Sequence, residues 1–521
     1  MKNCALIILD GYAITPEKEG NAVLLAKNQF TRDFISKFPK ALLKASGQEA
    51  GLPWGEVGNS EVGHTNIGLG RIVLQDLPQI DKSISENKLK DKPIIQEIAT
   101  TLKTNSSNLH IIGLASDGAV HCHINHMIAL VDLYKDQFPG KIILHLIADG
   151  RDVAEKSIEK YFAQINKVLS ERVVIGSVSG RYFSIDRDKN WDRIQKGYNA
   201  ILQKADIVTS TAEEAVKLAY GKNETDEFIS PTTVKLDVGI DLQKDVFIFA
   251  NYRSDRAIQL TRAFVDPALK EIQKQQICPN FITMTTYDDN LGVKVIFSNI
   301  ELNDKETNPL TNPFSQIISE SNLTQYHIAE TEKYAHVTYF FAGGVKDPYA
   351  GQENKLYESA KVKSHDLYPQ MRAAEITKDV ISNLGKGYNF IVINYANGDM
   401  VGHSGNQEAA IKTVDVIDFC LSQLIPKLHE ANYTVFLTAD HGNCDEMIDL
   451  KSKKPNKEHT LNPVFFVLAS PGGSGQYMSF DDFILSPPIG VLGDVTPTLL
   501  AHMGLEPSAE MTGMDLTQSL S

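Results

Sequence analysis

Short, almost continuous apolar runs recur along the chain, and each ends in a polar loop that leads into residues with helical spacing. Such runs are typical of strands buried on both faces of a parallel sheet, each followed by a crossover helix. After the second run, for example, Ile124, Ile128 and Val131 recur at helical spacing. The pattern therefore predicts an α/β fold throughout. The predicted strands lie within residues 4–11, 108–118, 141–152, 172–181, 245–256, 390–399 and 433–443.

The polar loops that end these runs fall into two chemical groups. Loops rich in Asp and His follow runs at both ends of the sequence, whereas loops rich in Arg follow runs in its middle. Both groups are candidate sites, because ligands of open parallel sheets gather outside the carboxyl ends of the strands. Their order predicts one α/β domain inserted into another. We expect a discontinuous domain of residues 1–76 and 307–521 and an insert of residues 77–306, with candidate linkers at 75–83 and 298–313.

Charge and hydropathy narrow the classes of partner. The 521-residue chain carries 51 Lys and Arg against 65 Asp and Glu, a formal net charge of −14. A chain this acidic is not expected to bind a nucleic acid backbone, and an anionic small substrate would need a local basic pocket. The N-terminus lacks the pattern of a signal peptide, and no apolar run approaches the roughly 20 residues that cross a bilayer. We expect a cytoplasmic protein without nucleic acid or membrane partners.

The five cysteines are scattered, and none belongs to a CxxC pair. This usage is typical of reduced thiols rather than of a disulfide framework. Cys444 lies near a charged motif, where binding of a metal by the thiol is an alternative to simple packing. We favour packing.

Six side chains of the Asp/His group have the chemistry of metal ligands. They are Asp10, Asp399, His403, Asp440, His441 and His459. A mixture of carboxylates and imidazoles suits Mn²⁺ or Zn²⁺ better than Ca²⁺ or Mg²⁺ alone. Because six ligands exceed the usual share of one ion, the group predicts a two-metal site, as in phosphoryl transfer, where the ions stabilise the entering and leaving oxygens.

Each of these residues also has a simpler interpretation. An Asp after a strand often caps a helix, and a lone His in a loop is often a surface or core residue. The four-residue spacing of Asp399 and His403 allows both to reach one ion, but this single spacing is weak evidence. Their joint appearance at successive strand ends favours metal binding.

The second group places five arginines, with His121 and Asp152, at the ends of four apolar runs. The arginines are Arg151, Arg181, Arg187, Arg253 and Arg256. Guanidinium groups match carboxylate and phosphate oxygens through two parallel hydrogen bonds, so the group predicts a site for a small dianion or trianion. The alternative is a solvated face, because the stretches RSDR and DRD carry their own counter-charges.

One serine, Ser60, lies between turn-forming glycines and a histidine in the stretch GNSEVGHTNIG, residues 58–68. Ser and Asn after Gly are common turn and helix-capping residues, so a cap is the first interpretation. The alternative is a nucleophile. A serine hydroxyl is a weak nucleophile until its pKa is lowered, and coordination to a divalent metal lowers it without a neighbouring base.

The motifs together resemble one protein family. Nine of them follow that family's order over nearly the whole chain: GNSEVGH, SDGAVHCH, DGRD, SGRY with DRD, NYRSDRA, ETEKYAHVTYFF, NYANGDMVGH, TADHGN and EHTLNPV. They are similar to the motifs of the cofactor-independent (2,3-bisphosphoglycerate-independent) phosphoglycerate mutases of the alkaline phosphatase superfamily. Among the departures from the family pattern, Ala119 stands where a glycine is usual and Ser254 where a proline is usual.

The resemblance implies a fold and an activity. The fold is an alkaline phosphatase-like, doubly wound sheet domain that binds metal, with a second α/β domain, for phosphotransfer and substrate binding, inserted into it. The activity is the interconversion of 3-phosphoglycerate and 2-phosphoglycerate in glycolysis and gluconeogenesis, without bisphosphoglycerate. The family also implies a monomer.

The resemblance assigns a role to each candidate residue. Ser60 would be the nucleophile that becomes phosphoserine. One metal ion would bind Asp399, His403 and His459, and the other Asp10, Ser60, Asp440 and His441. Phosphoglycerate and its transferring phosphoryl group would bind His121, Arg151, Asp152, Arg181, Arg187, Arg253, Arg256 and Lys333. Mn²⁺ is the expected metal, with Mg²⁺, Co²⁺ or Zn²⁺ as alternatives.

Lys333 and Asp152 each have two interpretations. On its own, Lys333 in TEKYAH has the pattern of a solvated lysine at a strand edge. The resemblance implies instead that it stabilises charge on the transferring phosphoryl group. Asp152 either moves protons between the glycerate hydroxyls or only orients a neighbouring arginine.

Two other functions are compatible with these residues. A metallophosphatase or another phosphomutase would use the same scaffold, since fold and metal site do not fix the acceptor. A catalytically silent metal- or phosphate-binding protein is the alternative from another class, although Ser60 and all six metal side chains are present. The arginine-rich insert favours a retained, small, carboxylated substrate and therefore a mutase.

Overall fold

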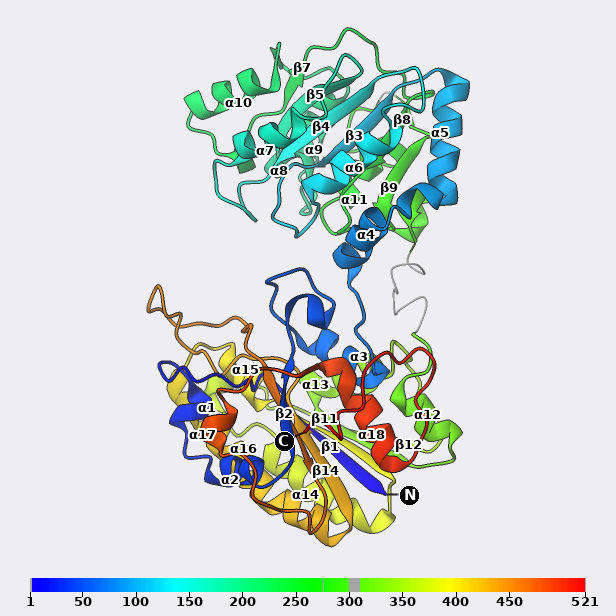
Figure 1. The fold of residues 1–521 in the computed structure, drawn as a ribbon. Helices are drawn as coiled ribbons and strands as arrows, with labels where there is room; N and C mark the ends of the chain where they lie inside the picture. The colour runs from blue at the N-terminus through cyan, green and yellow to red at the C-terminus, as the bar shows by residue number, and fades with distance from the viewer. Residues whose placement is uncertain (1, 275, 299–309, 521) are drawn as a thin grey trace. The chain divides into compact units, whose positions relative to one another are not determined.

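The chain forms two compact units in the computed structural model, which describes residues 2–274, 276–298 and 310–520 (Figure 1). Unit 1 comprises Met1–Pro78 with Asn303–Ser521, and unit 2 comprises Gln79–Leu302. The candidate linker at 75–83 is largely helical, because most of it belongs to α4 (Asp76–Ser85). The division between the two units lies within this helix. The candidate linker at 298–313 lies mostly outside the described residues.

Unit 1 is built on an eight-stranded sheet in the order β12-β11-β13-β1-β14-β15-β2-β16. The central strand β1 pairs in parallel with β13 and β14, whereas β15 runs antiparallel to β14 and β2. The strands are β1 (Asn3–Leu9), β2 (Lys40–Lys44), β11 (Gln325–Glu330), β12 (Gln352–Tyr357), β13 (Phe390–Tyr395), β14 (Tyr433–Thr438), β15 (Val464–Ala469) and β16 (Gly490–Val491).

Two groups of helices pack around this sheet. Helices α1, α2 and α14 contact the long helix α16, and α12 and α18 contact α3 (Figure 1). The helices are α1 (Ala22–Leu25), α2 (Gln29–Ser36), α3 (Ser60–Leu69), α12 (Phe314–Glu320), α13 (Thr331–Ala335), α14 (Ala373–Asn383), α15 (Asn397–Gly402), α16 (Gln407–Glu430), α17 (Phe480–Phe483) and α18 (Val495–Met503). A π-helical turn, η5 (His336–Phe340), follows α13.

Unit 2 has its own eight-stranded sheet in the order β10-β9-β8-β3-β4-β5-β7-β6, in which only the β5–β7 pair is antiparallel among the described pairings. The chain runs outward from β3 to β5 on one side and from β8 to β10 on the other, so a topological switch point lies between β3 and β8. The strands are β3 (Leu109–Leu114), β4 (Ile142–Ala148), β5 (Val173–Gly180), β6 (Ile207–Thr209), β7 (Thr232–Val234), β8 (Val246–Phe249), β9 (Phe281–Thr285) and β10 (Lys294–Phe297).

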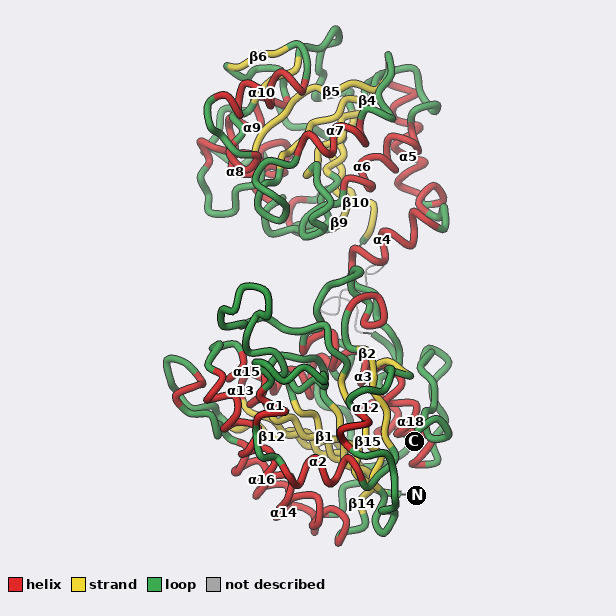
Figure 2. Tube along the Cα trace, turned by 60° about the vertical axis from the view of Figure 1, so that its left-hand side comes forward, coloured by secondary structure: helices red, strands yellow, loops and turns green. Residues whose placement is uncertain are grey.

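Helices surround the strands of each unit, as Figure 2 shows in red and yellow. Those of unit 2 are α5 (Pro93–Asn105), α6 (Ile124–Tyr134), α7 (Ile158–Ile165), α8 (Arg181–Ser184), α9 (Trp191–Ile201), α10 (Ala212–Gly221) and α11 (Ile258–Val265). Each apolar run of the sequence contains a strand, and the helix expected after the second run is α6, so the predicted α/β fold is confirmed. Among the described residues, no helix is long and apolar enough to cross a membrane.

Gly68 marks a close approach between α3 and the segment after η5. A Cβ built on Gly68 lies 2.0 Å from the backbone oxygen of Phe341, far inside van der Waals contact. We expect Gly68→Ala to lower the free energy of unfolding by about 1–3 kcal/mol, the usual range for overpacking, and to lower the melting temperature. Gly385→Ala is the matched control, because no described atom lies within 4 Å of its added Cβ. Equal melting temperatures for the two variants would contradict this close packing.

Candidate active site

Ser60 is the first residue of α3, and the neighbouring Asn59 caps that helix. The Asn59 side chain accepts a hydrogen bond from the Val62 N–H at 3.0 Å. The Ser60 hydroxyl instead faces a buried polar centre, where Oγ lies 3.1 Å from Asp10 Oδ1 and 2.9 Å from His441 Nε2. The interpretation of Ser60 as a helix cap is therefore wrong, and its role as a nucleophile stays a prediction.

Three neighbouring strands bring the acidic residues of this centre together. Asp10 follows β1, Asp440 follows β14, and Asp399 lies in α15 after β13, so all three lie at the carboxyl ends of adjacent parallel strands. Gly11 permits the close approach of two of these loops. It has a φ of +71°, and a Cβ at this position would lie 2.6 Å from the backbone of Asp399.

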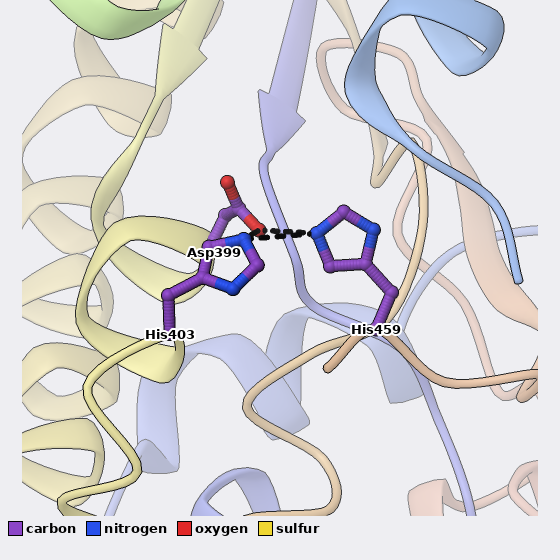
Figure 3. Close-up of side chains that lie close together, drawn as sticks. All are labelled: Asp399, His403 and His459. Atoms are coloured by element: carbon purple, nitrogen blue, oxygen red, sulfur yellow. Dashed lines mark hydrogen bonds and ion pairs between the residues drawn. The ribbon is translucent and has the colours of Figure 1, made fainter. Parts of the chain in front are cut away.

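Asp399, His403 and His459 form the first cluster (Figure 3). The Nε2 atoms of His403 and His459 lie 3.2 and 3.0 Å from Asp399 Oδ1, and 3.1 Å from each other. Each imidazole uses its other nitrogen on a backbone carbonyl: His403 Nδ1 donates to Lys457 O and His459 Nδ1 to Gly58 O, both at 2.7 Å. This leaves each Nε2 lone pair directed at the cluster, the orientation that a metal ligand needs.

Asp10, Asp440, His441 and Ser60 form a second cluster beside the first. His441 Nε2 lies 3.5 Å from both Asp10 Oδ1 and Asp440 Oδ2. Asp440 Oδ2 is buried without a hydrogen-bond partner among the described residues, which is costly for a carboxylate oxygen. An oxygen in this condition fits a cation ligand.

Negative charge dominates the centre. Burial raises the pKa of Asp10, but the nearby Lys333 ammonium and the contact with His441 together outweigh this effect and hold that pKa well below its usual range. Burial lowers the pKa of His441, but the negative charge of Asp440, with those of Asp399 and Asp10, outweighs burial and raises the pKa to about 9. This negative charge therefore favours a cation at the centre, either a proton on His441 or a metal ion.

The donor set fits divalent metal ions. Three groups of carboxylate and imidazole atoms each lie within 4.8 Å of one another: Asp399, His403 and His459; Asp10, Asp399 and His441; and Asp10, His64 and Asp440. Mixed oxygen and nitrogen ligands suit Mn²⁺, Co²⁺ or Zn²⁺. The clusters are thus consistent with a two-metal site.

Lys333 lies inside this centre. It comes from α13, which follows β11, the neighbour of β13, and it is 3% exposed. Its ammonium group donates to Ser60 Oγ and Asp399 Oδ2, both at 2.6 Å, and lies 2.6 Å from Asp10 Oδ1. The interpretation of Lys333 as a solvated lysine at a strand edge is wrong.

Three further residues support the centre and were not among the sequence candidates. His64 Nδ1 lies 2.9 Å from the Ser60 carbonyl and 3.3 Å from Asp440 Oδ2. Asn394 donates to Asp10 Oδ2 at 2.8 Å, and Asn443 donates to Asp399 Oδ1 at 3.3 Å. Two sequence signals were available: His64 lies four residues after Ser60, on the same face of α3, and Asn394 interrupts an otherwise apolar strand.

The cysteine near this centre packs as expected. Cys444 Sγ donates to the Gly11 carbonyl at 3.2 Å. Burial raises the pKa of its thiol, so the group stays protonated. All five cysteines are free and buried.

Unit 2 brings the arginine group to the carboxyl ends of β4, β5 and β8, around its switch point. Arg181 is buried and donates to Asp149 Oδ1 and Asp152 Oδ2, both at 2.5 Å. His121, from the loop after β3, is also buried, and its Nε2 lies 4.0 Å from Asp152 Oδ2. The structure thus brings Arg181, Asp152 and His121 together, and their binding of phosphoglycerate stays a prediction.

The other arginines are more open to solvent. Arg187 and Arg253 both contact Asp255, and Arg151 lies 3.7 Å from Glu227 Oε1. Only Arg253 pairs within its own stretch, as expected, whereas Arg187 and Arg151 pair with acids of other loops, within a half-exposed surface. Arg256 donates to the Ile185 carbonyl at 3.4 Å. Burial, followed by repulsion from Arg181, Arg187 and Arg151, lowers the pKa of the Arg256 guanidinium, as expected where positive charge is in excess.

Ala119 occupies a backbone conformation that favours glycine. Its φ is +57°, in the left-handed region, within the loop that carries His121. A glycine at this position, as in the family pattern, would adopt the same turn without steric conflict with Cβ.

The predicted phosphoglycerate-binding residues divide between the two units. Lys333 belongs to unit 1, and the remaining seven belong to unit 2. The predicted metal ligands and Ser60 all belong to unit 1.

Comparison with known proteins identifies the family. The family described as BPG-independent PGAM N-terminus matches residues 80–289, and the family of type I phosphodiesterases and nucleotide pyrophosphatases matches residues 292–464. A 2,3-bisphosphoglycerate-independent phosphoglycerate mutase of Clostridium perfringens is 41% identical over 520 residues, 98% of each chain. The corresponding protein of Clostridium tetani is 39% identical over 524 residues, 99% of each chain.

A solved structure agrees with this result. A phosphoglycerate mutase of Leishmania mexicana, crystallised at low cobalt concentration, aligns with a TM-score of 0.56 and 28% identity, over 98% of this chain and 97% of that one. The expected fold, a phosphatase-like α/β domain with a second domain inserted, is confirmed. Motifs, fold and relatives therefore agree: the chain belongs to the family of 2,3-bisphosphoglycerate-independent phosphoglycerate mutases, of the alkaline phosphatase superfamily.

Proposed function

We propose that this protein interconverts 3-phosphoglycerate and 2-phosphoglycerate through a phosphoserine intermediate on Ser60, without bisphosphoglycerate. The observation that carries the proposal is the environment of the Ser60 hydroxyl, which lies 2.6 Å from Lys333 Nζ and 2.9 Å from His441 Nε2 within the buried Asp/His clusters. The Clostridium relatives bear the name of this activity.

Each cluster would hold one divalent ion. Asp399, His403 and His459 would bind the first ion, and Asp10, Ser60, Asp440 and His441 the second. We propose Mn²⁺ for both positions, because its preferences include carboxylate and imidazole ligands. Bound ions would lower the pKa of the Ser60 hydroxyl and neutralise charge on a phosphoryl group.

The side chains of unit 1 would perform the transfer. Ser60 Oγ forms a bond to phosphorus as the bond between phosphorus and the glycerate oxygen breaks. The Lys333 ammonium, already beside Ser60 Oγ, neutralises charge on the equatorial phosphoryl oxygens. Ser60 is also the first residue of α3, so the N-terminal partial charge of that helix favours the same anion.

Unit 2 would keep glycerate bound while its second hydroxyl turns towards phosphoserine. His121, Arg151, Arg181, Arg187, Arg253 and Arg256 would hold the carboxylate and exclude water. Asp152 would return a proton to one glycerate oxygen and remove one from the other. Arg181 contacts Asp152 Oδ2, which supports an orienting role and leaves Oδ1 for the proton. Unit 1 is thus proposed as the metal-binding domain and unit 2 as the inserted substrate domain of a cytoplasmic monomer.

The test supplies 3-phosphoglycerate to chelator-treated protein with Mn²⁺ restored, in the absence of bisphosphoglycerate. We expect metal-dependent 2-phosphoglycerate with little free phosphate, measured in the same tube. Ser60→Ala is expected to abolish both turnover and trapped phosphoserine. Asn59→Ala is the control, because loss of the cap costs about 1 kcal/mol of stability but leaves the hydroxyl in place.

Other outcomes would identify another reaction. Mostly free phosphate would mean that water is the acceptor and that the protein is a metallophosphatase. Substantial turnover by Ser60→Ala without phosphoserine would remove Ser60 from the mechanism. Binding of phosphoglycerate without any turnover would point to a silent binding protein.

Metal affinity is expected to fall as the pH falls. The hydrogen bond with Asp399 raises the pKa of His403, and the pKa of His441 is about 9, so protons compete with a metal for both imidazoles. Below pH 9, displacement of one proton weakens Mn²⁺ binding by about tenfold for each unit of pH lost. Equilibrium dialysis at pH 6, 7 and 8 measures how the Mn²⁺ affinity changes with pH.

The stability of metal-stripped protein is expected to change in the opposite direction, falling as the pH rises. Because the folded-state pKa of His441 is raised from 6.5 to about 9, its protonation stabilises the fold fully below pH 6.5, and this contribution is lost as pH rises through 9. The melting temperature of stripped protein should therefore lose this contribution between pH 6.5 and 9. A Mn²⁺ affinity that does not change from pH 8 to 6 would contradict imidazole ligation.

A further inference from the structure

The Asp255 carboxylate of unit 2 contacts the side chains of two arginines and one histidine. Asp255 has no role in the function proposed above. Its Oδ2 lies 3.2 Å from Arg187 Nη1. Its Oδ1 lies 3.2 Å from Arg253 Nε and 3.5 Å from His121 Nδ1. These three partners are all proposed to bind phosphoglycerate.

The three partners come from different parts of the sheet edge. His121 follows β3, Arg187 follows α8 beyond β5, and Arg253 follows β8. Asp255 therefore lies between the groups of the proposed anion site rather than beside one of them. Its side chain is 31% exposed, so solvent and ligands reach it.

The contacts of Asp255 differ from those of the acids around Arg181. Asp149, 1% exposed in its side chain, is a fixed partner that also accepts a hydrogen bond from Ser116. The Arg187 and Arg253 side chains are instead 48% and 51% exposed, and ion pairs of this kind are weak. Asp255 can therefore exchange its partners, whereas Asp149 cannot without burying an unpaired charge.

The site is incompletely satisfied with Asp255 in this position. His121 Nδ1 and Asp255 Oδ1 are both buried atoms without a hydrogen-bond partner among the described residues. Burial, followed by repulsion from Arg181, lowers the pKa of His121 to about 4, so the imidazole is neutral near pH 7. Asp255 thus compensates Arg187 and Arg253 alone, and the repulsion around Arg256 shows that positive charge is still in excess.

We propose that Asp255 is an internal counter-anion of the phosphoglycerate site. Its carboxylate holds Arg187 and Arg253 close to the positions in which they bind a substrate anion, and it releases them when phosphoglycerate arrives. Asp255 is therefore a positioning residue that also sets affinity, because the substrate must displace a like charge. This inference rests on the proposed function of the same arginines.

This proposal predicts that loss of Asp255 strengthens anion binding, whereas loss of a merely structural residue would weaken it or leave it unchanged. Removing the charge of Asp255 should tighten anion binding, because Arg187 and Arg253 lose a competitor and the site loses a repulsive charge. Tighter binding of substrate alone does not accelerate the chemical step. KM should therefore fall without a gain in kcat.

The experiment compares Asp255→Asn with Asp192→Asn, an exposed acid of α9 whose removal changes the net charge equally. Both changes are placed in full-length Ser60→Ala protein, and calorimetry measures the Kd of 3-phosphoglycerate and of inorganic phosphate. We expect Asp255→Asn to lower both values by about five- to tenfold, and Asp192→Asn to change them less than about twofold. With Ser60 present, KM should fall by a similar factor.

Weaker or unchanged binding by Asp255→Asn, relative to Asp192→Asn, would overturn the proposal. If Asp255→Asn melts at a lower temperature, Asp255→Ser provides a second uncharged variant. The proposal requires that this variant, too, binds both anions more tightly. Failure of the proposed function has a different signature: the Ser60→Ala protein would bind inorganic phosphate but not 3-phosphoglycerate. The phosphate titration would then still decide whether Asp255 competes with anions.

Discussion

Three carboxylates, Asp10, Asp399 and Asp440, are almost completely buried at the ends of adjacent strands, and the rest of the site follows from that burial. Charges removed from water are tolerated only when opposite charge and hydrogen bonds compensate them. Lys333 supplies one positive charge, and Asn394 and Asn443 supply hydrogen bonds. Asp440 Oδ2 accepts no hydrogen bond from any described residue and has only the longer contacts with His64 and His441, so this compensation is incomplete and the centre suits divalent ions.

The candidate sites of the two units carry opposite charge. Unit 1 concentrates carboxylates, which would hold the proposed metal ions and through them favour a phosphoryl group. Unit 2 concentrates guanidinium groups around a switch point between β3 and β8, where we propose that they bind the substrate anion directly. A chain with a net charge of −14 thus gathers positive charge locally, where the proposed small anionic substrate would need it.

Much of this organisation could be predicted from the sequence, because it depends on local patterns. Apolar runs mark the strands, and the Asp, His and Arg residues of the candidate sites follow them directly. The environments of Ser60 and Lys333 were harder to predict, because they depend on contacts between residues that lie hundreds of positions apart in the sequence. A capping residue and a nucleophile look alike until Asn59 is seen to cap α3, and Lys333 is buried only because β11 lies beside β13. For the same reason, the contacts of His64, Asn394 and Asp255 required the structure.

The Gly58 carbonyl has a consequence beyond the orientation of one imidazole. It accepts the Nδ1–H of His459, which is a proposed ligand of one ion, and it belongs to the turn that leads into Ser60, a proposed ligand of the other. A Cβ at Gly58 would lie 2.0 Å from the Ala45 carbonyl, so this turn has little freedom to move. The proposed nucleophile, Ser60, and the proposed metal ligand, His459, are therefore linked through a single peptide group. A mutation that shifts this turn would therefore move the His459 imidazole and the Ser60 hydroxyl together.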